Sequence, residues 1–301
     1  MTPPARVSRE IRINANRTEI AAQEWKHGEP TKNVLLLHGW QDNSNSFNKL
    51  VQLLPQEWWL VAIDFPGHGL SSQRPEGAPY IVTDWVSDVR LVVRNLGWKK
   101  FTIIGHSMGA GVALMYAALF PDLVEAVVSL DVVKQMSDIP GTSVKVMRNA
   151  VIALTNYDEP ENRPVEIYNS KQDAVDAWYE KHKDNMTKAA VEIILERGLK
   201  QTDDGRQQIA RDPRLTLPPL YRMPLEQHRA VMKELKCDLL ITKAKDSQAW
   251  ETPEVEKEFL EMYGKNCSRF ERLETDGLHH LHVDTPERVA SKIVAFLQTP
   301  K

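Results

Sequence analysis

One short stretch places a serine where it could act as a nucleophile. Residues 105–109 read Gly-His-Ser-Met-Gly, which matches the pattern G-x-S-x-G. An apolar run at residues 101–104 predicts a strand before it, and residues 110–120 predict a helix that ends before Pro121. A sharp turn from strand to helix exposes the serine hydroxyl, and the glycines admit backbone where a Cβ would clash. We therefore predict Ser107 as a nucleophile.

Three histidines gather late in the chain, at positions 279, 280 and 282. A serine hydroxyl is a weak nucleophile at neutral pH, so it needs such a base within hydrogen-bond reach. Clustered histidines are also typical of metal sites, but no cysteine or carboxylate lies at a ligand-like spacing from these three. We therefore predict that this cluster supplies the base and that no metal ion is bound.

Two aspartates are candidates for the acid that orients the base and stabilises its imidazolium. Asp246 follows a predicted strand at residues 239–242, and Asp131 follows another at residues 124–130. Either could instead be structural, Asp246 as a turn or helix-capping residue and Asp131 as a brace where the next segment begins. The residues alone leave both candidates open.

Alternating strands and helices must position these side chains. Continuous apolar runs predict buried strands of a mainly parallel sheet, at residues 34–37, 58–63, 101–104, 124–130, 238–242 and 269–273. Residues 7–26 predict two antiparallel strands. Further helices are predicted at residues 47–54, 83–96, 252–263 and 286–297. This alternation indicates an α/β fold.

The alternation stops in the middle of the chain. Residues 132–224 show no convincing alternation of strands and helices, and they predict three helices, at 144–154, 171–182 and 188–199. We predict a core at residues 1–131 and 225–301, with residues 132–224 inserted as a helical cap. The insertion belongs at the C-terminal edge of the sheet, where α/β folds bind their ligands.

Bulk properties exclude several classes of protein. The 301 residues carry a net charge of −3, so no nucleic acid or anionic membrane is expected as a partner. No stretch approaches the ~18 apolar residues of a membrane span. The two cysteines are too few for a disulfide framework, and no signal peptide is evident. We expect a cytoplasmic protein; peroxisomal or vesicular association and a homodimer stay open.

Several motifs in order along the chain resemble the α/β-hydrolase superfamily. They are the His-Gly-Trp turn at 38–40, the run Asp-Phe-Pro-Gly-His-Gly-Leu-Ser at 64–71, the serine motif at 105–109, and the late aspartate and histidine segments. The chain is more particularly similar to the serine hydrolase-like proteins, the group that includes Kraken. Residues 130–133, 211–215 and 279–282 carry that closer likeness.

The resemblance implies a mostly parallel central sheet flanked by helices and the triad order serine, acid, histidine. Counting back from Pro286 in the family-like pattern selects His279 as the base, with His280 as the alternative. The usual place of the acid in the superfamily favours Asp246, with Asp131 as the alternative.

The same resemblance suggests the remaining site residues. The backbone N–H groups of Met108 and Trp40 would form the oxyanion hole. Trp40, His106, Trp178 and Tyr221 are candidates for lining a substrate pocket, since such pockets are mostly apolar. No cofactor is implied.

The sequence thus predicts a serine hydrolase that cleaves an acyl ester or thioester of a small apolar substrate through an acyl-enzyme. Serine at the elbow argues against dehalogenase or epoxide hydrolase chemistry, which resembles the same fold with aspartate there. The alternatives are an amidase, a carbon–carbon hydrolase or a cofactor-free haloperoxidase, and a ligand-binding receptor with little turnover.

Overall fold

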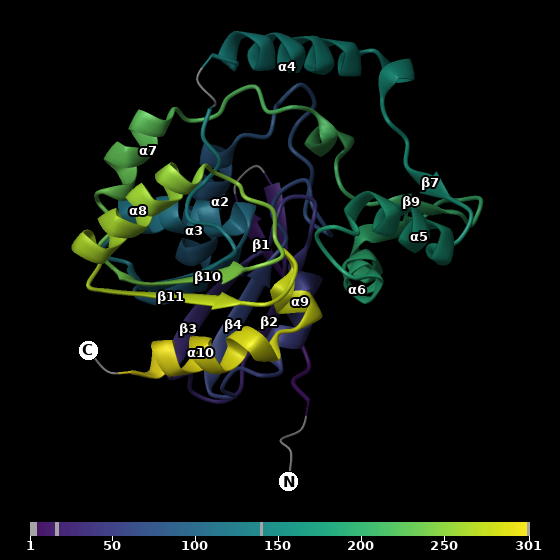
Figure 1. The fold of residues 1–301 in the computed structure, drawn as a ribbon. Helices are drawn as coiled ribbons and strands as arrows, with labels where there is room; N and C mark the ends of the chain where they lie inside the picture. The colour runs from purple at the N-terminus through teal and green to yellow at the C-terminus, as the bar shows by residue number, and fades with distance from the viewer. Residues whose placement is uncertain (1–4, 16–17, 139–140, 300–301) are drawn as a thin grey trace.

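The computed structural model describes residues 5–15, 18–138 and 141–299, and its centre is an eight-stranded sheet (Figure 1). The order is β1-β2-β4-β3-β5-β6-β10-β11. The strands are β1 (Arg9–Ala15), β2 (Thr18–Trp25), β3 (Lys32–Leu37), β4 (Trp58–Ile63), β5 (Phe101–His106), β6 (Val124–Leu130), β10 (Asp238–Ala244) and β11 (Arg269–Thr275). Pairings β1–β2 and β2–β4 are antiparallel and the others parallel. The predicted α/β-hydrolase fold is confirmed; positions 16–17 of the predicted first turn lie outside the described residues.

Helices cover both faces of the sheet, because each central strand is apolar on both sides. The helices of one face are α2 (Val82–Leu96), α3 (Met108–Leu119), α7 (Leu225–Met232) and α8 (Pro253–Asn266). Those of the other are α1 (Asn48–Val51), α9 (Leu281–Asp284) and α10 (Glu287–Gln298). Strand β3 shows the alternation: Leu35 and Leu37 pack into the first core, whereas Val34 and Leu36 pack into the second.

Residues 132–224, here called the inserted segment, leave the sheet after β6 and return at α7. The segment contains α4 (Ser143–Asp158), α5 (Lys171–His182), α6 (Lys188–Gly198) and the short 3-10 helices Pro160–Asn162 and Pro213–Thr216. It also contains a small sheet ordered β7-β9-β8, from Ile167–Tyr168, Gln207–Ile209 and Leu199–Gln201. The sequence did not indicate these strands, because strands of two or three residues are too short to show a period.

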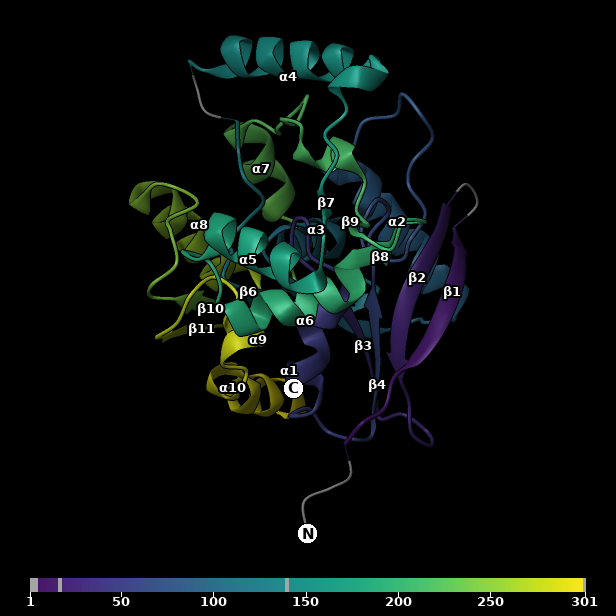
Figure 2. The same cartoon turned by 90° about the vertical axis from the view of Figure 1, so that its right-hand side faces the viewer.

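One part of the inserted segment, built by α5 and α6, is firmly attached to the core. Its own apolar cluster includes Trp178 and Ile194 and reaches Val283 of α9, and Figure 2 shows α6 close to α9. Polar contacts complete the attachment. Asn43 donates to the Ile194 carbonyl at 2.9 Å, from the loop that enters the 3-10 helix Ser44–Phe47.

Two buried arginines hold the inserted segment at further points. The Arg197 guanidinium contacts Asp64 at 2.7 Å and Glu10 at 2.8 Å. Near the segment's return, Arg214 pairs with Asp212 at 2.6 Å, and Asp212 accepts the Tyr80 hydroxyl at 2.8 Å. The Arg-Asp-Pro-Arg run of the sequence therefore ties the inserted segment to the core.

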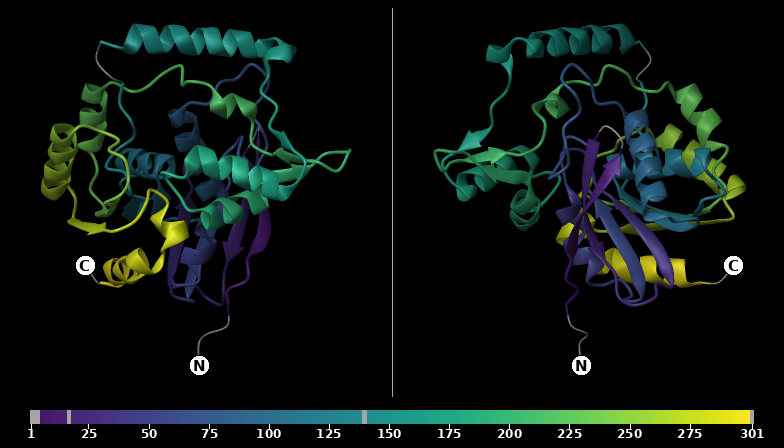
Figure 3. Two further views of the ribbon diagram at one scale, coloured as in Figure 1. Left: turned by 45° about the vertical axis from the view of Figure 1, so that its right-hand side comes forward. Right: turned by 180° about the vertical axis from the view of Figure 1, so that it is seen from behind.

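Helix α4 is the other part, and it stands away from the body of the molecule (Figure 3). Ala150 is its one buried residue among those described. Several of its apolar side chains face solvent, namely Val144 at 71%, Met147 at 52%, Val151 at 51% and Ile152 at 50% exposure.

Candidate active site

Ser107 lies at the turn between β5 and α3, in a backbone conformation that few side chains adopt. Its φ is 51° and its ψ −117°. Only three non-glycine residues among those described have a positive φ, and the other two are Gln41 and Asp131. Such strain persists where the surrounding structure over-determines it, and it gathers at functional sites. The half-exposed serine faces a cavity at the N-terminus of α3.

The glycines of the motif are required by close backbone contacts. A Cβ on Gly109 would lie 2.2 Å from the carbonyl oxygen of Leu37, and one on Gly105 would lie 2.5 Å from that of Gly109. Both distances are far below ordinary contact, so any larger residue would push α3 away from the sheet. The spacing of the motif therefore sets how tightly the turn closes.

His279 and Asp131 meet at the C-terminal edge of the sheet. Nδ1 of His279 lies 2.6 Å from Oδ2 of Asp131, and both side chains are buried. Oδ1 of Asp131 accepts the Ala244 N–H at 2.9 Å, so the carboxylate has a fixed orientation. Trp250 packs on the imidazole with ring centroids 4.7 Å apart, a neighbour that no sequence pattern pointed to. His279 and Ser107 line the same cavity.

Both partners are held in the protonation states that a base and its orienting acid need. Burial lowers the pKa of His279 below its ordinary value, although the hydrogen bond with Asp131 opposes this shift. Burial alone would raise the pKa of Asp131, but the hydrogen bond and charge of His279, the hydrogen bond from Ser247 and the charge of Lys243 together outweigh it, so the pKa is lowered. The imidazole is therefore neutral near pH 7 and the carboxylate ionised.

Asp246, which the sequence favoured as the acid, does not contact His279. This exposed carboxylate accepts the Gly277 N–H at 3.0 Å and so closes the loop that leads to the histidine. The sequence pointed to the wrong neighbour of His279 because it does not state how the strands are paired. Strands β6 and β10 are neighbours, with Leu130 opposite Thr242, so the first residue after β6 points to where the histidine arrives.

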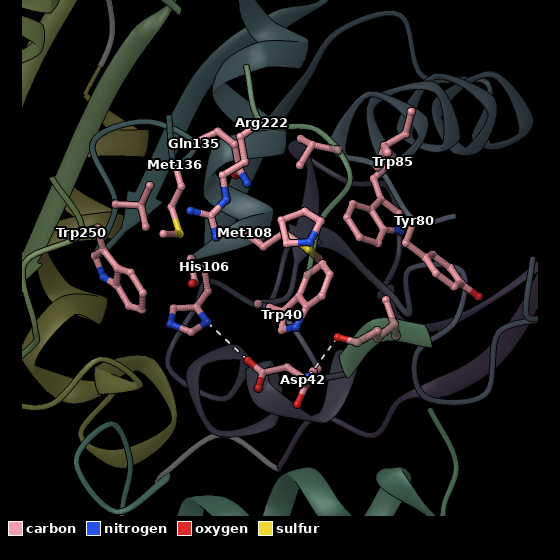
Figure 4. A pocket seen from close by; sticks show the side chains of 18 of the residues that line it. Trp40, Asp42, Tyr80, Trp85, His106, Met108, Gln135, Met136, Arg222 and Trp250 are labelled. Atoms are coloured by element: carbon pink, nitrogen blue, oxygen red, sulfur yellow. Dashed lines mark hydrogen bonds and ion pairs between the residues drawn. The ribbon is translucent and has the colours of Figure 1, made fainter. Parts of the chain in front are cut away.

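His280, the alternative base, is engaged elsewhere. Its Nε2 lies 3.2 Å from both oxygens of Asp42, and its Nδ1 lies 3.2 Å from the Asn185 carbonyl oxygen. Asp42 also lies 3.4 Å from Nδ1 of His106, the contact drawn as a dashed line in Figure 4. Sequence reasoning missed Asp42, because a single aspartate in a loop has no spacing that marks it.

This buried cluster is an ion pair with a neutral histidine beside it. Burial opposes the charge of His280, yet Asp42 outweighs it and the pKa of His280 is raised. The pKa of Asp42 is held well below its usual range, because the two histidines overcome the effect of its burial. Burial lowers the pKa of His106 to about 3. The ligand atoms of Asp42, His106 and His280 lie within 4.8 Å of one another, but Asp42 and His280 already neutralise each other; the absence of a metal stays a prediction.

The cavity beside Ser107 has a volume of about 540 Å³ (Figure 4). Its lining includes Trp40, His106, Trp178 and Tyr221, the four candidates for contacts with a substrate. That they bind a substrate stays a prediction. Its walls are otherwise mostly apolar, with side chains such as Trp85, Met115, Met136 and Leu215.

The two predicted oxyanion donors also face this cavity. Met108 is the first residue of α3, so its N–H has no acceptor inside the helix. Trp40 follows Gly39 at the end of β3, and its indole packs edge-on against Trp85 with centroids 5.6 Å apart. An oxygen bound between them would lie at the positive end of the α3 dipole.

The sheet order, the elbow and the helices on both faces define an α/β hydrolase. A sequence profile of the alpha/beta hydrolase fold matches residues 32–159. A hypothetical protein from Pseudomonas aeruginosa PAO1, known from its crystal structure, superposes with a TM-score of 0.84 at 29% sequence identity, over 97% of this chain and 98% of its own.

Two relatives narrow the class. A serine hydrolase-like protein from Danio rerio is 37% identical over 99% of this chain and 90% of its own length. A probable serine hydrolase from Drosophila melanogaster is 31% identical over 91% and 83%. The chain belongs to the serine hydrolase-like family of α/β hydrolases. Among the described residues, no helix combines the length and apolarity needed to cross a bilayer.

Proposed function

We propose that this protein is a serine hydrolase that cleaves a carboxylic ester or thioester through an acyl-enzyme. The observation that supports the proposal is that three side chains of the expected kinds lie at the same place. Ser107 on a strained turn shares a cavity with His279, whose Nδ1 is bonded to Asp131. Asp131 thus replaces Asp246 as the proposed acid, and the inserted segment is proposed to act as the cap of the cavity.

The reaction would proceed in two balanced steps. His279 takes the proton from Ser107 as the Ser107 oxygen bonds to the acyl carbon, while the N–H groups of Met108 and Trp40 stabilise the oxyanion. The bond to the leaving group then breaks, and the leaving group receives that proton from the imidazolium. Water, deprotonated by the same histidine, then attacks the acyl-serine, whose cleavage returns the proton to Ser107 and releases the carboxylic acid.

The test is fluorophosphonate labelling of the wild type and of Ser107→Ala, read by intact mass. It is run beside hydrolysis of p-nitrophenyl esters from acetate to long chains, with EDTA in every assay because the proposal requires no metal. A single adduct on the wild type that is absent from the variant would support an activated Ser107. The chain-length profile then measures the cavity.

The rival functions give different results. Amidase, carbon–carbon hydrolase or haloperoxidase chemistry would give the adduct but faster turnover of an anilide, a β-diketone or a halide assay than of any ester. A receptor would bind a ligand tightly with neither adduct nor turnover on a folded protein. That last outcome would overturn the proposal.

A further inference from the structure

The charged side chains around the cavity are paired, with one exception. Asp42 is the only acidic residue that lines the cavity in the described part of the chain, and His280 neutralises it. Lys134 is buried and bonds to Glu251 and Ser137. These pairs leave the cavity without a free carboxylate.

The exception is Arg222. This half-buried residue lines the cavity, and no hydrogen bond, ion pair or aromatic contact of its guanidinium is found within residues 5–15, 18–138 and 141–299. Figure 4 shows its side chain reaching inward, with the guanidinium directed toward Met136 and Met108. Met108 directly follows Ser107, so the cation points toward the end of the cavity that holds the serine.

Other buried arginines of the inserted segment show what such a group normally has. Arg197 contacts Asp64 and Glu10, Arg211 contacts Glu166, and Arg214 contacts Asp212. In this structure a guanidinium removed from solvent is therefore matched by a carboxylate supplied by the chain. Arg222 is less deeply buried than these three, and the described part of the chain supplies no carboxylate partner for it.

We propose that the partner is the substrate: an ester or thioester whose acyl chain is mainly apolar and ends in a carboxylate that Arg222 binds. The planar guanidinium matches a carboxylate through two parallel hydrogen bonds. The apolar walls would contact the methylene groups between that carboxylate and the scissile carbonyl. This inference rests on the proposed hydrolase function and names the substrate class of the same site.

The experiment compares matched esters. Mono-p-nitrophenyl adipate, pimelate and suberate carry a free carboxylate, and their methyl-capped counterparts differ only in lacking that charge. The measured quantity is the ratio of kcat/KM between the two members of each pair. Because a hydrogen bond to a charged group is worth more than a neutral one, we expect a ratio of about 10 or more for the best chain length.

Three variants assign the preference. Arg222→Met keeps the apolar stem and removes the charge, so its ratio should fall to about 1, whereas Arg222→Lys should retain part of the preference. Arg148→Met removes a cation from exposed α4, outside the cavity, and should leave the wild-type ratio unchanged. A wild-type ratio near 1, or a ratio that Arg222→Met does not alter, would overturn the inference.

Two further arms separate the sources of failure. A butyrate ester of 4-hydroxybenzoate places the carboxylate on the leaving group, and an Arg222-dependent preference for this ester alone would contradict the acyl-chain assignment. If no ester is hydrolysed and Ser107 is not labelled, the proposed function fails by itself. Calorimetry with suberate then decides about Arg222: binding that is lost in Arg222→Met supports the anion site, and absence of binding overturns it.

Discussion

The edge of the sheet and the inserted segment face the same cavity but are built in opposite ways. At the edge, Ser107 and Asp131 each have a positive φ directly after a strand, and the N–H of each donates to the carbonyl of a neighbouring strand. The Asp131 side chain is fully buried, whereas Ser107 is half exposed to the cavity. The inserted segment is anchored at α6 and the 213–216 turn, whereas α4 has hardly any buried surface. The contrast suggests that the edge sets the chemistry and the insertion sets what enters.

The largest effect is expected from replacing each of the two candidate acids by asparagine, which tests whether the sheet edge carries the chemistry. Asp131→Asn should lower kcat by about 10⁴-fold with the fold retained, because the neutral amide favours the wrong tautomer of His279. Asp246→Asn is the matched control and should keep most activity, since its carboxylate only closes a loop. Steady-state kinetics with a p-nitrophenyl ester measures both, and circular dichroism confirms folding. A kcat of Asp131→Asn close to that of the wild type would exclude Asp131 as the acid.

A second test probes the buried ion pair beside the edge. Asp42→Asn leaves the His280 charge buried without a partner, which should cost about 3–5 kcal/mol in the free energy of unfolding near pH 6. The folded-state pKa of His280 is raised, so the pair stabilises fully below the ordinary histidine pKa of about 6.5. That contribution disappears as the pH rises through the folded-state value.

Urea unfolding at several pH values therefore measures the sign directly. The difference between wild type and Asp42→Asn should shrink as the pH rises, whereas Asp203→Asn, on an exposed turn, should differ little from wild type at any pH. A difference that grows with pH would show that His280 is not the charged partner.

The difference in packing between α6 and α4 can be measured with the same substitution, valine to alanine, in each helix. Val191→Ala in α6 removes buried methyl groups and should cost roughly 1.5–3 kcal/mol in the free energy of unfolding. Val151→Ala in α4, where the side chain is half exposed, should change it by less than about 0.5 kcal/mol. Equal costs would mean that α4 packs on the protein in solution.

The smallest expected effect is a shift in a pH profile. His279 acts as a base only when neutral, and burial lowers its pKa. The rate constant kcat/KM for a neutral ester should therefore rise through an apparent pKa below the ordinary histidine value of about 6.5. A midpoint above that value would indicate that the histidine is stabilised as a cation.

The sequence predicted what local physics determines and missed what depends on distant contacts. The strand, glycines and helix around Ser107 lie within one stretch, and the cap of α2 by Gly97 in the left-handed conformation was equally local. The choice between Asp131 and Asp246 depended on which strand end His279 reaches, which spacing does not state. No motif marked Asp42 or Arg222, because their roles depend on whether a residue distant in the sequence lies beside them in the fold.

One detail of the ladder has a consequence for how such proteins diverge. The proposed nucleophile and the proposed acid follow adjacent strands, and the Ser107 N–H donates to the Leu130 carbonyl at 3.1 Å. Both residues lie in the first half of the chain, so the pairing of β5 with β6 sets the distance between them. Everything between β6 and β10 can be lengthened, shortened or replaced over evolutionary time without moving one against the other. New specificities can arise in this lineage by exchange of a segment, while the pair beneath it stays as it was.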